Sequence, residues 1–264
     1  MSKDPRGGKN TFRTKNNKST EGPISKKKSS NWKSKLKRLV LKTLLYFFII
    51  SLGLVVVYKF VPIPVTSTMI SRKMEAIEEG KDSEIHYDWV SYDEISKEAP
   101  LAVVAAEDQL FPEHNGFDFE AMSNAFTKNL KGKKLRGAST LSQQVAKNVF
   151  LWQSRSYIRK VFEVYFTVLI ELIWGKQRIL EVYLNVAEMG DMTFGVEEAS
   201  QRFFNTSAKN LSRQEAARIA AVLPSPRKWS AAKPGPYVNR RTNAITRQMR
   251  ALGGITYISG LRSF

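Results

Sequence analysis

The feature that most constrains this chain is an apolar stretch of 20 residues, Leu39–Tyr58, whose single charge is Lys42. At a rise of about 1.5 Å per residue, a helix of this length crosses the hydrocarbon layer of a bilayer. The sequence therefore predicts one transmembrane helix over residues 39–60. A cleaved signal peptide and a buried core helix fit less well, because the stretch is long and follows an extended basic segment.

That basic segment is residues 1–38, which hold thirteen Lys and Arg residues against two acidic residues. Few of its side chains are apolar, so we expect a disordered tail. The positive-inside rule places the tail in the cytoplasm and everything after the helix outside, in a single-pass protein of the cell (inner or cytoplasmic) membrane.

The formal net charge of +18 raises the alternative of a nucleic-acid-binding protein. Most of this charge lies in the tail and not in the rest of the chain, so no nucleic-acid partner is expected. The absence of cysteine excludes disulfides, cysteine nucleophiles, Fe–S clusters and cysteine zinc sites, and two histidines are too few for a His-rich metal site.

The segment beyond the apolar stretch reads as a proline-containing linker (61–66), one mainly α domain (67–252) and a C-terminal tail (253–264). Capping boxes predict that helices begin at Thr140 and at Ser212. Residues 86–91 are β-prone and ambiguous. We expect helices over residues 69–77, 95–106 with an interruption or kink at Pro100, 119–130, 140–150, 156–174, 176–187, 216–223 and 238–252.

Two acidic residues, Glu107 and Asp108, end the very apolar run Val103–Ala106. An apolar wall desolvates a carboxylate and raises its pKa, which suits a general acid or base. The alternative is an ordinary solvated helix end, although acids at a helix C-terminus oppose the helix dipole.

A third acidic residue, Glu163, lies within the apolar run Val161–Phe166, directly after Arg159 and Lys160. A charge in such a run is unfavourable unless it is paired or used. A salt bridge to a neighbouring arginine therefore stays open beside a functional role. Two carboxylates from separate helices are typical of enzymes that act on glycosidic bonds.

Between these acids, the basic, glycine-containing segment 131–137 leads into a predicted helix N-terminus rich in hydroxyls and amides. Such an N-terminus favours anions, so we expect phosphate binding there. A nucleotide-hydrolysing P-loop is excluded, because Ala138 stands where that loop needs its lysine. A solvated basic face is the alternative.

The residues together resemble the bacterial peptidoglycan glycosyltransferases, glycosyltransferase family 51, which include the glycosyltransferase domain of class A penicillin-binding proteins. The segments that resemble the family's five motifs, in the family's order, are EDQLFPEHNG (107–116), GASTLSQQVAKN (137–148), RKVFE (159–163), ILEVYLN (179–185) and EAARIAAVLPSP (215–226). They span roughly residues 67–250. Because the sequence ends after this domain, we expect the monofunctional type without a transpeptidase module.

The resemblance implies a lysozyme-like, mainly helical fold with a flexible membrane-proximal lobe. It also implies polymerisation of lipid II by inverting glycosyl transfer, with release of undecaprenyl pyrophosphate. Glu107 would be the general base, and Glu163 would assist at the donor pyrophosphate. The residues expected to bind substrate are Asp108, His114, Ser139, Thr140, Gln143, Gln144, Lys147, Arg155 and Arg159.

No cofactor is implied with certainty; the resemblance leaves open a divalent cation, Mg or Mn, at the donor pyrophosphate near Glu163. The implied partners are lipid II, the growing lipid-linked glycan chain, the membrane and other proteins of cell-wall synthesis and division. The alternatives are a lysozyme-like glycoside hydrolase that acts on peptidoglycan, and an inactive structural partner of the cell-wall machinery.

Overall fold

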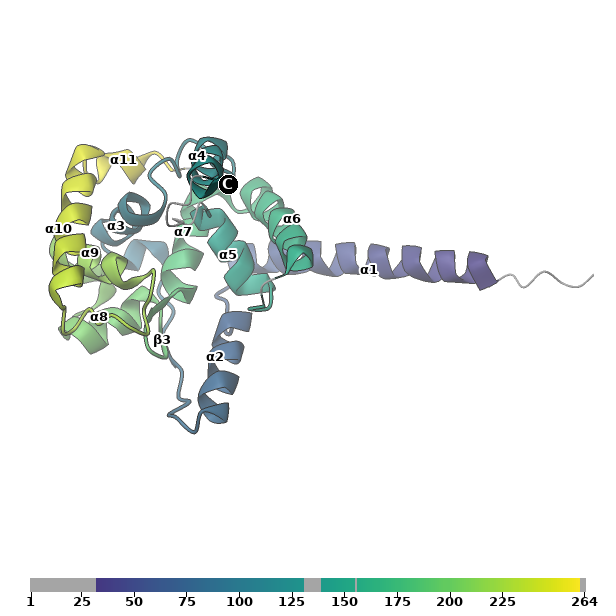
Figure 1. Ribbon diagram of the computed structural model, residues 1–264, viewed down its shortest axis with the longest axis horizontal. Coiled ribbons are helices and arrows are strands. Elements are labelled where there is room, and N and C mark those ends of the chain that lie inside the picture. The colour runs from purple at the N-terminus through teal and green to yellow at the C-terminus, as the bar shows by residue number, and fades with distance from the viewer. Residues whose placement is uncertain (1–31, 131–138, 155, 262–264) are drawn as a thin grey trace, which may run out of the picture. The chain divides into compact units, whose positions relative to one another are not determined.

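The computed structural model describes residues 32–130, 139–154 and 156–261 (Figure 1). The fold is mainly α, as predicted. The helices are α1 (Trp32–Phe60), α2 (Ser67–Glu78), α3 (Glu98–Glu107), α4 (Phe119–Leu130), α5 (Leu141–Phe150), α6 (Tyr157–Ile173), α7 (Gly175–Val186), α8 (Val196–Phe204), α9 (Arg213–Val222), α10 (Pro236–Ala251) and α11 (Thr256–Ser259), with 3-10 turns η1 (Tyr92–Glu94) and η2 (Ala208–Asn210). Most of the basic tail and all of segment 131–137 lie outside the described residues.

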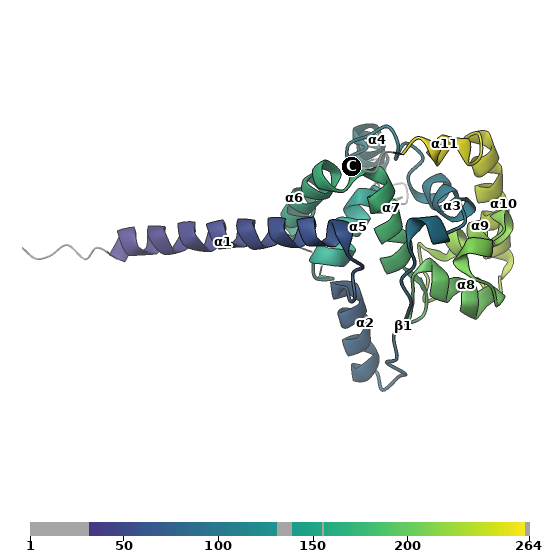
Figure 2. The same ribbon diagram turned by 180° about the vertical axis from the view of Figure 1, so that it is seen from behind.

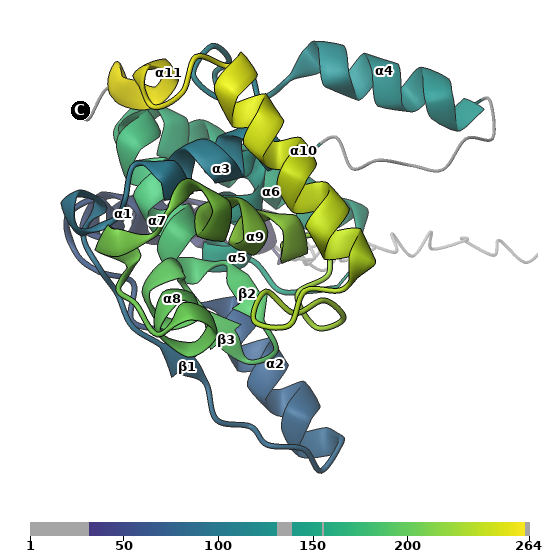
Figure 3. The ribbon, with the colours of Figure 1, turned by 90° about the vertical axis from the view of Figure 1, so that its left-hand side faces the viewer.

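Helix α3 forms the centre of the domain and is apolar on every side. All residues from Ala99 to Ala105 are buried, and Leu101, Ala102 and Val104 are fully so. Helices α9 and α10 pack against it, and Figure 3 shows α10 crossing over α9 with α3 beside them. A helix enclosed in this way delivers the side chains at its C-terminal end into a region from which most water is excluded.

The start of α3 corrects one expectation. We expected a helix from Ile95 with an interruption or kink at Pro100, but α3 begins at Glu98, after the η1 turn. Pro100 therefore lies in the first turn, where backbone N–H groups have no acceptor within the helix. A proline at this position removes no helical hydrogen bond, so the helix runs on without a break at Pro100.

Three very short strands form a sheet in the order β1-β3-β2. Strand β1 (His86–Tyr87) pairs in parallel with β3 (Thr193–Phe194), which pairs antiparallel with β2 (Glu188–Gly190). The β-prone character of residues 86–91 thus yields two strand residues. The sheet joins the chain that follows α2 to the chain that follows α7.

The chain divides between Phe47 and Phe48 into two compact units. In the first unit, α1 exposes apolar side chains such as Leu41, Leu45 and Tyr46. Helix α1 is long and apolar enough to cross a membrane, and it fits a single-pass anchor.

The last turns of α1 belong to the second unit and join its core. Val55 is fully buried, and the indole N–H of Trp174 donates to the Val55 carbonyl at 2.7 Å. The guanidinium of Arg178 donates to the Tyr58 carbonyl at 2.8 Å. Figure 2 shows α6 and α7 beside this end of α1. The segment Phe48–Phe60 is therefore part of the domain's structure as well as part of the apolar helix.

Candidate functional site

The carboxylate of Glu107 lies at the C-terminal end of buried α3, with 18% of its side chain exposed. Gln144 of α5 donates to Glu107 Oε2 at 3.2 Å, and a guanidinium nitrogen of Arg241 in α10 lies 3.5 Å from Oε1. Tyr183 of α7 donates to the Gln144 carbonyl oxygen at 3.4 Å, which turns the amide NH₂ of Gln144 toward Glu107. Two helices, α5 and α10, thus present polar groups to one carboxylate, and a third, α7, orients one of these groups.

Burial raises the pKa of Glu107 above its ordinary value. The hydrogen bond from Gln144 and the charge of Arg241 oppose this rise, and the neighbouring charge of Asp108 adds to it. The net direction is upward, as the apolar approach along α3 predicts. A carboxylate in this state is a better proton acceptor than a solvated one.

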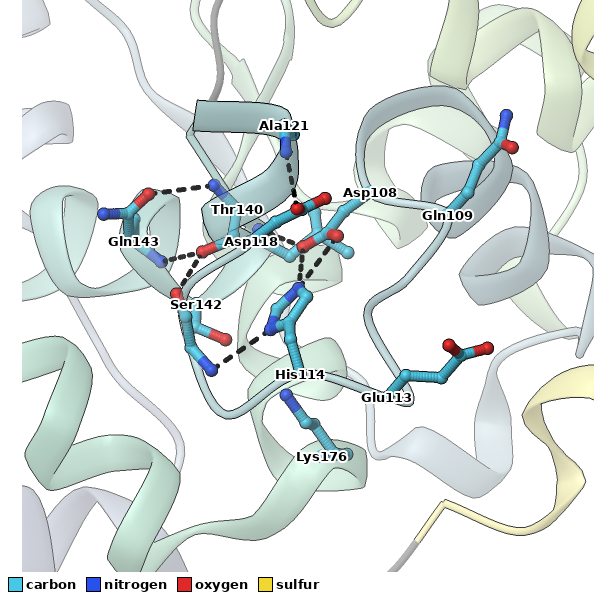
Figure 4. Close-up of polar contacts among 12 residues, drawn as sticks. Asp108, Gln109, Glu113, His114, Asp118, Ala121, Thr140, Ser142, Gln143 and Lys176 are labelled. Atoms are coloured by element: carbon cyan, nitrogen blue, oxygen red, sulfur yellow. Dashed lines mark hydrogen bonds and ion pairs between the residues drawn. The ribbon is translucent and has the colours of Figure 1, made fainter. Parts of the chain in front are cut away.

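Asp108 takes part in a buried polar network that Figure 4 shows in close-up. Its carboxylate accepts from the Leu141 N–H at 2.9 Å and lies 2.9 Å from His114 Nε2. The Nδ1 atom of His114 accepts from the Gly116 N–H, so the ring proton belongs on Nε2 and points at Asp108. Asp108 and His114 therefore tie the end of α3 to the start of α5.

The N-terminus of α5 is closed by the capping box that the sequence predicts. Thr140 Oγ accepts from the Gln143 N–H, and the Gln143 side chain accepts from the Thr140 N–H at 3.1 Å. The Thr140 hydroxyl also donates to the Gly116 carbonyl at 2.7 Å. Both side chains are buried and hydrogen-bonded within the protein, whereas Ser139, just before them, is exposed.

Glu163 lies on α6, with only 4% of its side chain exposed. Arg159 Nη1 lies 3.0 Å from one carboxylate oxygen, and Lys160 Nζ contacts the other. The salt bridge that the sequence left open is therefore present. It uses the i,i+4 and i,i+3 spacings of a helix.

Lys147 of α5 lies close enough to Glu163 for their charges to interact. Burial lowers the pKa of Lys147, the negative charge of Glu163 opposes this, and Arg159 and Lys160 reinforce it. Its ammonium group has no hydrogen bond or ion pair with any other residue in the described ranges. A partly buried ammonium without a partner is well placed to receive an anion.

The donor set around Glu163 does not fit a resident divalent cation. Magnesium and manganese prefer several oxygen ligands, and here Arg159 and Lys160 already occupy both carboxylate oxygens. Among the residues that the structure describes, one group of three acidic or histidine side chains brings ligand atoms within 4.8 Å of one another: Asp82, Glu84 and His86. That group is exposed or half-buried and does not include Glu163.

A polar pocket of about 330 Å³ opens between α2, α5 and the chain that follows α7. Its lining combines hydroxyls, amides and charged groups that could bind sugar or phosphate oxygens. Two residues predicted to bind substrate, Gln144 and Lys147, line it, and Gln144 connects it to Glu107. The other lining residues are Thr68, Ser71, Arg72, Glu75, Asn148, Gln153, Tyr183, Ala187, Glu188, Leu223 and Pro226.

The structure thus gathers the predicted residues into two groups. Gln144 joins Glu107, with the network of Asp108, His114, Thr140 and Gln143 behind it. Arg159 and Lys147 join Glu163. Arg155 lies outside the described residues.

Sequence reasoning missed Arg241 and Tyr183 at the first group. It also missed a buried ion pair behind the network, in which Lys176 Nζ lies 2.8 Å from Glu171 while Ser142 donates to Glu171. The charge of Glu171 in the apolar run of α6 was the one available signal for this pair, by the same argument that applies to Glu163.

The chain is similar to known proteins over most of its length. A family model described as Transglycosylase matches residues 73–250. A protein of Pseudomonas savastanoi pv. phaseolicola, named biosynthetic peptidoglycan transglycosylase, is 50% identical over 226 residues, which cover 86% of this chain and 96% of that protein. Proteins of the same name from Pseudomonas aeruginosa (50% identical; 84% of this chain, 95% of that protein) and Xanthomonas euvesicatoria pv. vesicatoria (53%; 78% and 84%) are similar.

Proposed function

The chain belongs to the transglycosylase family, and from that premise we propose that it polymerises lipid II into β-1,4-linked peptidoglycan glycan strands. The observation that carries the proposal is the Glu107 carboxylate, held at the end of a buried helix with a raised pKa. The reaction releases undecaprenyl pyrophosphate. It serves cell-wall synthesis, and its substrates are lipid II and the growing lipid-linked chain.

Glu107 acts as the general base. The 4-hydroxyl of the acceptor's N-acetylglucosamine attacks C1 of the donor's N-acetylmuramic acid, and Glu107 Oε takes the hydroxyl proton. The attack comes from the face opposite the pyrophosphate, so the anomeric configuration inverts. Gln144, oriented by Tyr183, fixes the direction in which the carboxylate points.

The group around Glu163 receives the donor pyrophosphate. Lys147 and Arg159 supply positive charge to the leaving group, and Glu163 keeps the cations Arg159 and Lys160 in place from behind. This arrangement needs no metal ion. The other predicted ligands divide by burial: exposed Ser139 can reach substrate, while Thr140 and Gln143 hold the helix N-terminus in position.

Helix α1 keeps the enzyme where its lipid-linked substrate is. Basic residues precede the apolar stretch, so we place the N-terminal tail in the cytoplasm and the catalytic domain outside the cytoplasmic membrane. Confinement to the membrane raises the effective concentration of lipid II at the site. Other proteins of cell-wall synthesis and division remain expected partners.

A lysozyme-like hydrolase would also use a buried glutamate. The cationic group around Glu163 favours the transferase, because a hydrolase acting on finished glycan has no pyrophosphate to stabilise.

The test is incubation of the purified full-length protein with lipid II, with products sized by gel before and after muramidase digestion. Glu107→Gln is the test variant. Glu113→Gln, an exposed glutamate of the same motif, is the matched control. We expect long, muramidase-sensitive chains from the wild type and the control, and none from Glu107→Gln. If the wild type left lipid II intact but cleaved finished peptidoglycan, the proposed polymerase activity would be wrong and the protein would be a hydrolase.

A further inference from the structure

This inference rests on the proposal that Glu107 is the general base. The burial of Glu107 and its role as a base then place opposite requirements on its protonation state. Burial favours the protonated carboxyl, yet a base must be ionised when the acceptor hydroxyl arrives. Some group must therefore stabilise the carboxylate without saturating it. Among the described residues, Arg241 is the cation that lies nearest to this carboxylate in an ion pair, at 3.5 Å.

Helix α10 places Arg241 by packing. The buried residues of α10 that face the domain include Val238, Thr242 and Ile245, and α10 packs on both α3 and α9. Arg241 is directly before Thr242, and 27% of its side chain is exposed. Its Nε is buried and has no hydrogen-bond partner among the described residues. The guanidinium is therefore held beside Glu107 mainly by the position of its helix.

The other charged and titratable groups near Glu107 cannot supply this stabilisation. Asp108 is negative, and Tyr183 of α7 is a neutral phenol whose pKa burial raises well above its ordinary value. From α9, Arg213 pairs with Glu98, at the opposite end of α3. From α11, Tyr257 donates to the Gln109 carbonyl. Gln144 of α5 helps as a neutral donor, which leaves Arg241 as the cation.

We propose that Arg241 is a positioning residue that keeps Glu107 ionised and aimed at the acceptor hydroxyl. The contact is long and partly exposed, so it stabilises the carboxylate only moderately. A short bidentate pair would make Glu107 too weak a base, and the loss of the cation would favour the protonated carboxyl further. Arg241 thus sets the pH at which the enzyme becomes active.

The test is the pH dependence of kcat/KM for lipid II polymerisation by the full-length protein, with Arg241→Gln, Arg241→Lys and Arg240→Gln. Arg240, the neighbouring residue on α10, is exposed and has no ion pair with any residue in the described part of the chain, so it controls for loss of one charge. For Arg241→Gln we expect the acid limb to move to higher pH. Activity should fall about tenfold on that limb and about twofold or less on the plateau.

Arg241→Lys should give an acid limb between those of the wild type and Arg241→Gln, because it keeps the charge without the planar fork. This variant also tests the inference if Arg241→Gln folds poorly, since it preserves the charge of α10. The limb of Arg240→Gln should coincide with that of the wild type.

An equal loss of activity at every pH, with the acid limb unmoved, would overturn the inference and assign Arg241 to structure or substrate binding. The Glu107→Gln variant separates this failure from that of the proposed function. If Glu107→Gln is inactive while Arg241→Gln keeps the wild-type limb, only the inference fails. If Glu107→Gln polymerises normally, the assignment of the base fails as well.

Discussion

Glu107 and Glu163 are both glutamates on helices with little exposed surface, but their surroundings differ in kind. Glu107 has one amide donor and one arginine at 3.5 Å, all from other helices, and burial dominates its pKa. Glu163 has two cations from its own helix, each within hydrogen-bonding distance. The first carboxylate has few partners and a raised pKa, and the second is held by two cations in a salt bridge. Burial alone therefore does not identify a base; the number and distance of its partners do.

The largest test of this comparison is kinetic. Glu107→Gln should lower kcat by about 10³-fold, within the range for a general base, while KM for lipid II changes little. Glu163→Gln should act mainly on KM, because it loosens Arg159 and Lys160 at the donor pyrophosphate. Steady-state rates on lipid II for both variants separate these outcomes. If Glu163→Gln lowered kcat as much as Glu107→Gln does, at unchanged KM, the assignment of different roles to the two glutamates would be contradicted.

The same two variants should also change the free energy of unfolding differently: Glu163→Gln should lower it, and Glu107→Gln should not. Glu163→Gln removes the anion of a buried salt bridge, and we expect a loss of about 1–2 kcal/mol, reduced because Lys160 is half-exposed. Glu107→Gln relieves a carboxylate that burial disfavours, so its free energy of unfolding should equal or exceed that of the wild type. Thermal unfolding in detergent at neutral pH measures both.

The pH dependence sharpens this second test. The pKa of Glu107 is raised on folding, so the folded state holds the proton more tightly than the unfolded state, and this contribution to stability falls as pH rises above about 4.5. The difference in free energy of unfolding between Glu107→Gln and the wild type should therefore increase above that pH. It should become constant once the carboxyl of the folded wild type is ionised. An advantage that is constant from low to neutral pH would contradict the raised pKa.

The smallest expected effect concerns Lys147, whose pKa is lowered by burial. Its ammonium loses its proton at a lower pH than an ordinary lysine, so pyrophosphate binding should weaken early on the alkaline side. Lys147→Arg keeps its charge and should move the alkaline limb of kcat/KM to higher pH, with a change of about threefold or less at neutral pH. Lys73→Arg, exposed on α2, is the control. An unmoved alkaline limb would mean that another group sets it.

Local signals in the sequence predicted local features correctly. The capping boxes at Thr140 and Ser212 begin α5 and α9 as expected, because each involves residues only three apart. The salt bridge at Glu163 could be foreseen for the same reason. Its partners lie one helical turn away on the same element.

Features that join distant parts of the chain could not be read from the sequence. The ion pair between Glu107 and Arg241 links α3 to α10, and nothing near either residue indicates the other. The three strands have two or three residues each, too few to show an alternating pattern. Strand β1 pairs with β3, and five α-helices, α3 to α7, lie between them in the sequence. Pro100 does not kink the helix, because the effect of a proline depends on where the helix begins, and α3 begins at Glu98, only two residues before it.

The burial of Val55 has a practical consequence for anyone who wishes to produce the catalytic domain without its anchor. A truncation that starts after Phe60 would remove a side chain from the hydrophobic interior and leave the indole N–H of Trp174 without its carbonyl acceptor. The guanidinium of Arg178 would lose the Tyr58 carbonyl and keep only that of Val61. A soluble fragment would thus expose an apolar surface where the helix had packed, and this surface would bind detergent or cause aggregation. The useful fragment begins near Phe48 and keeps the last turns of the helix.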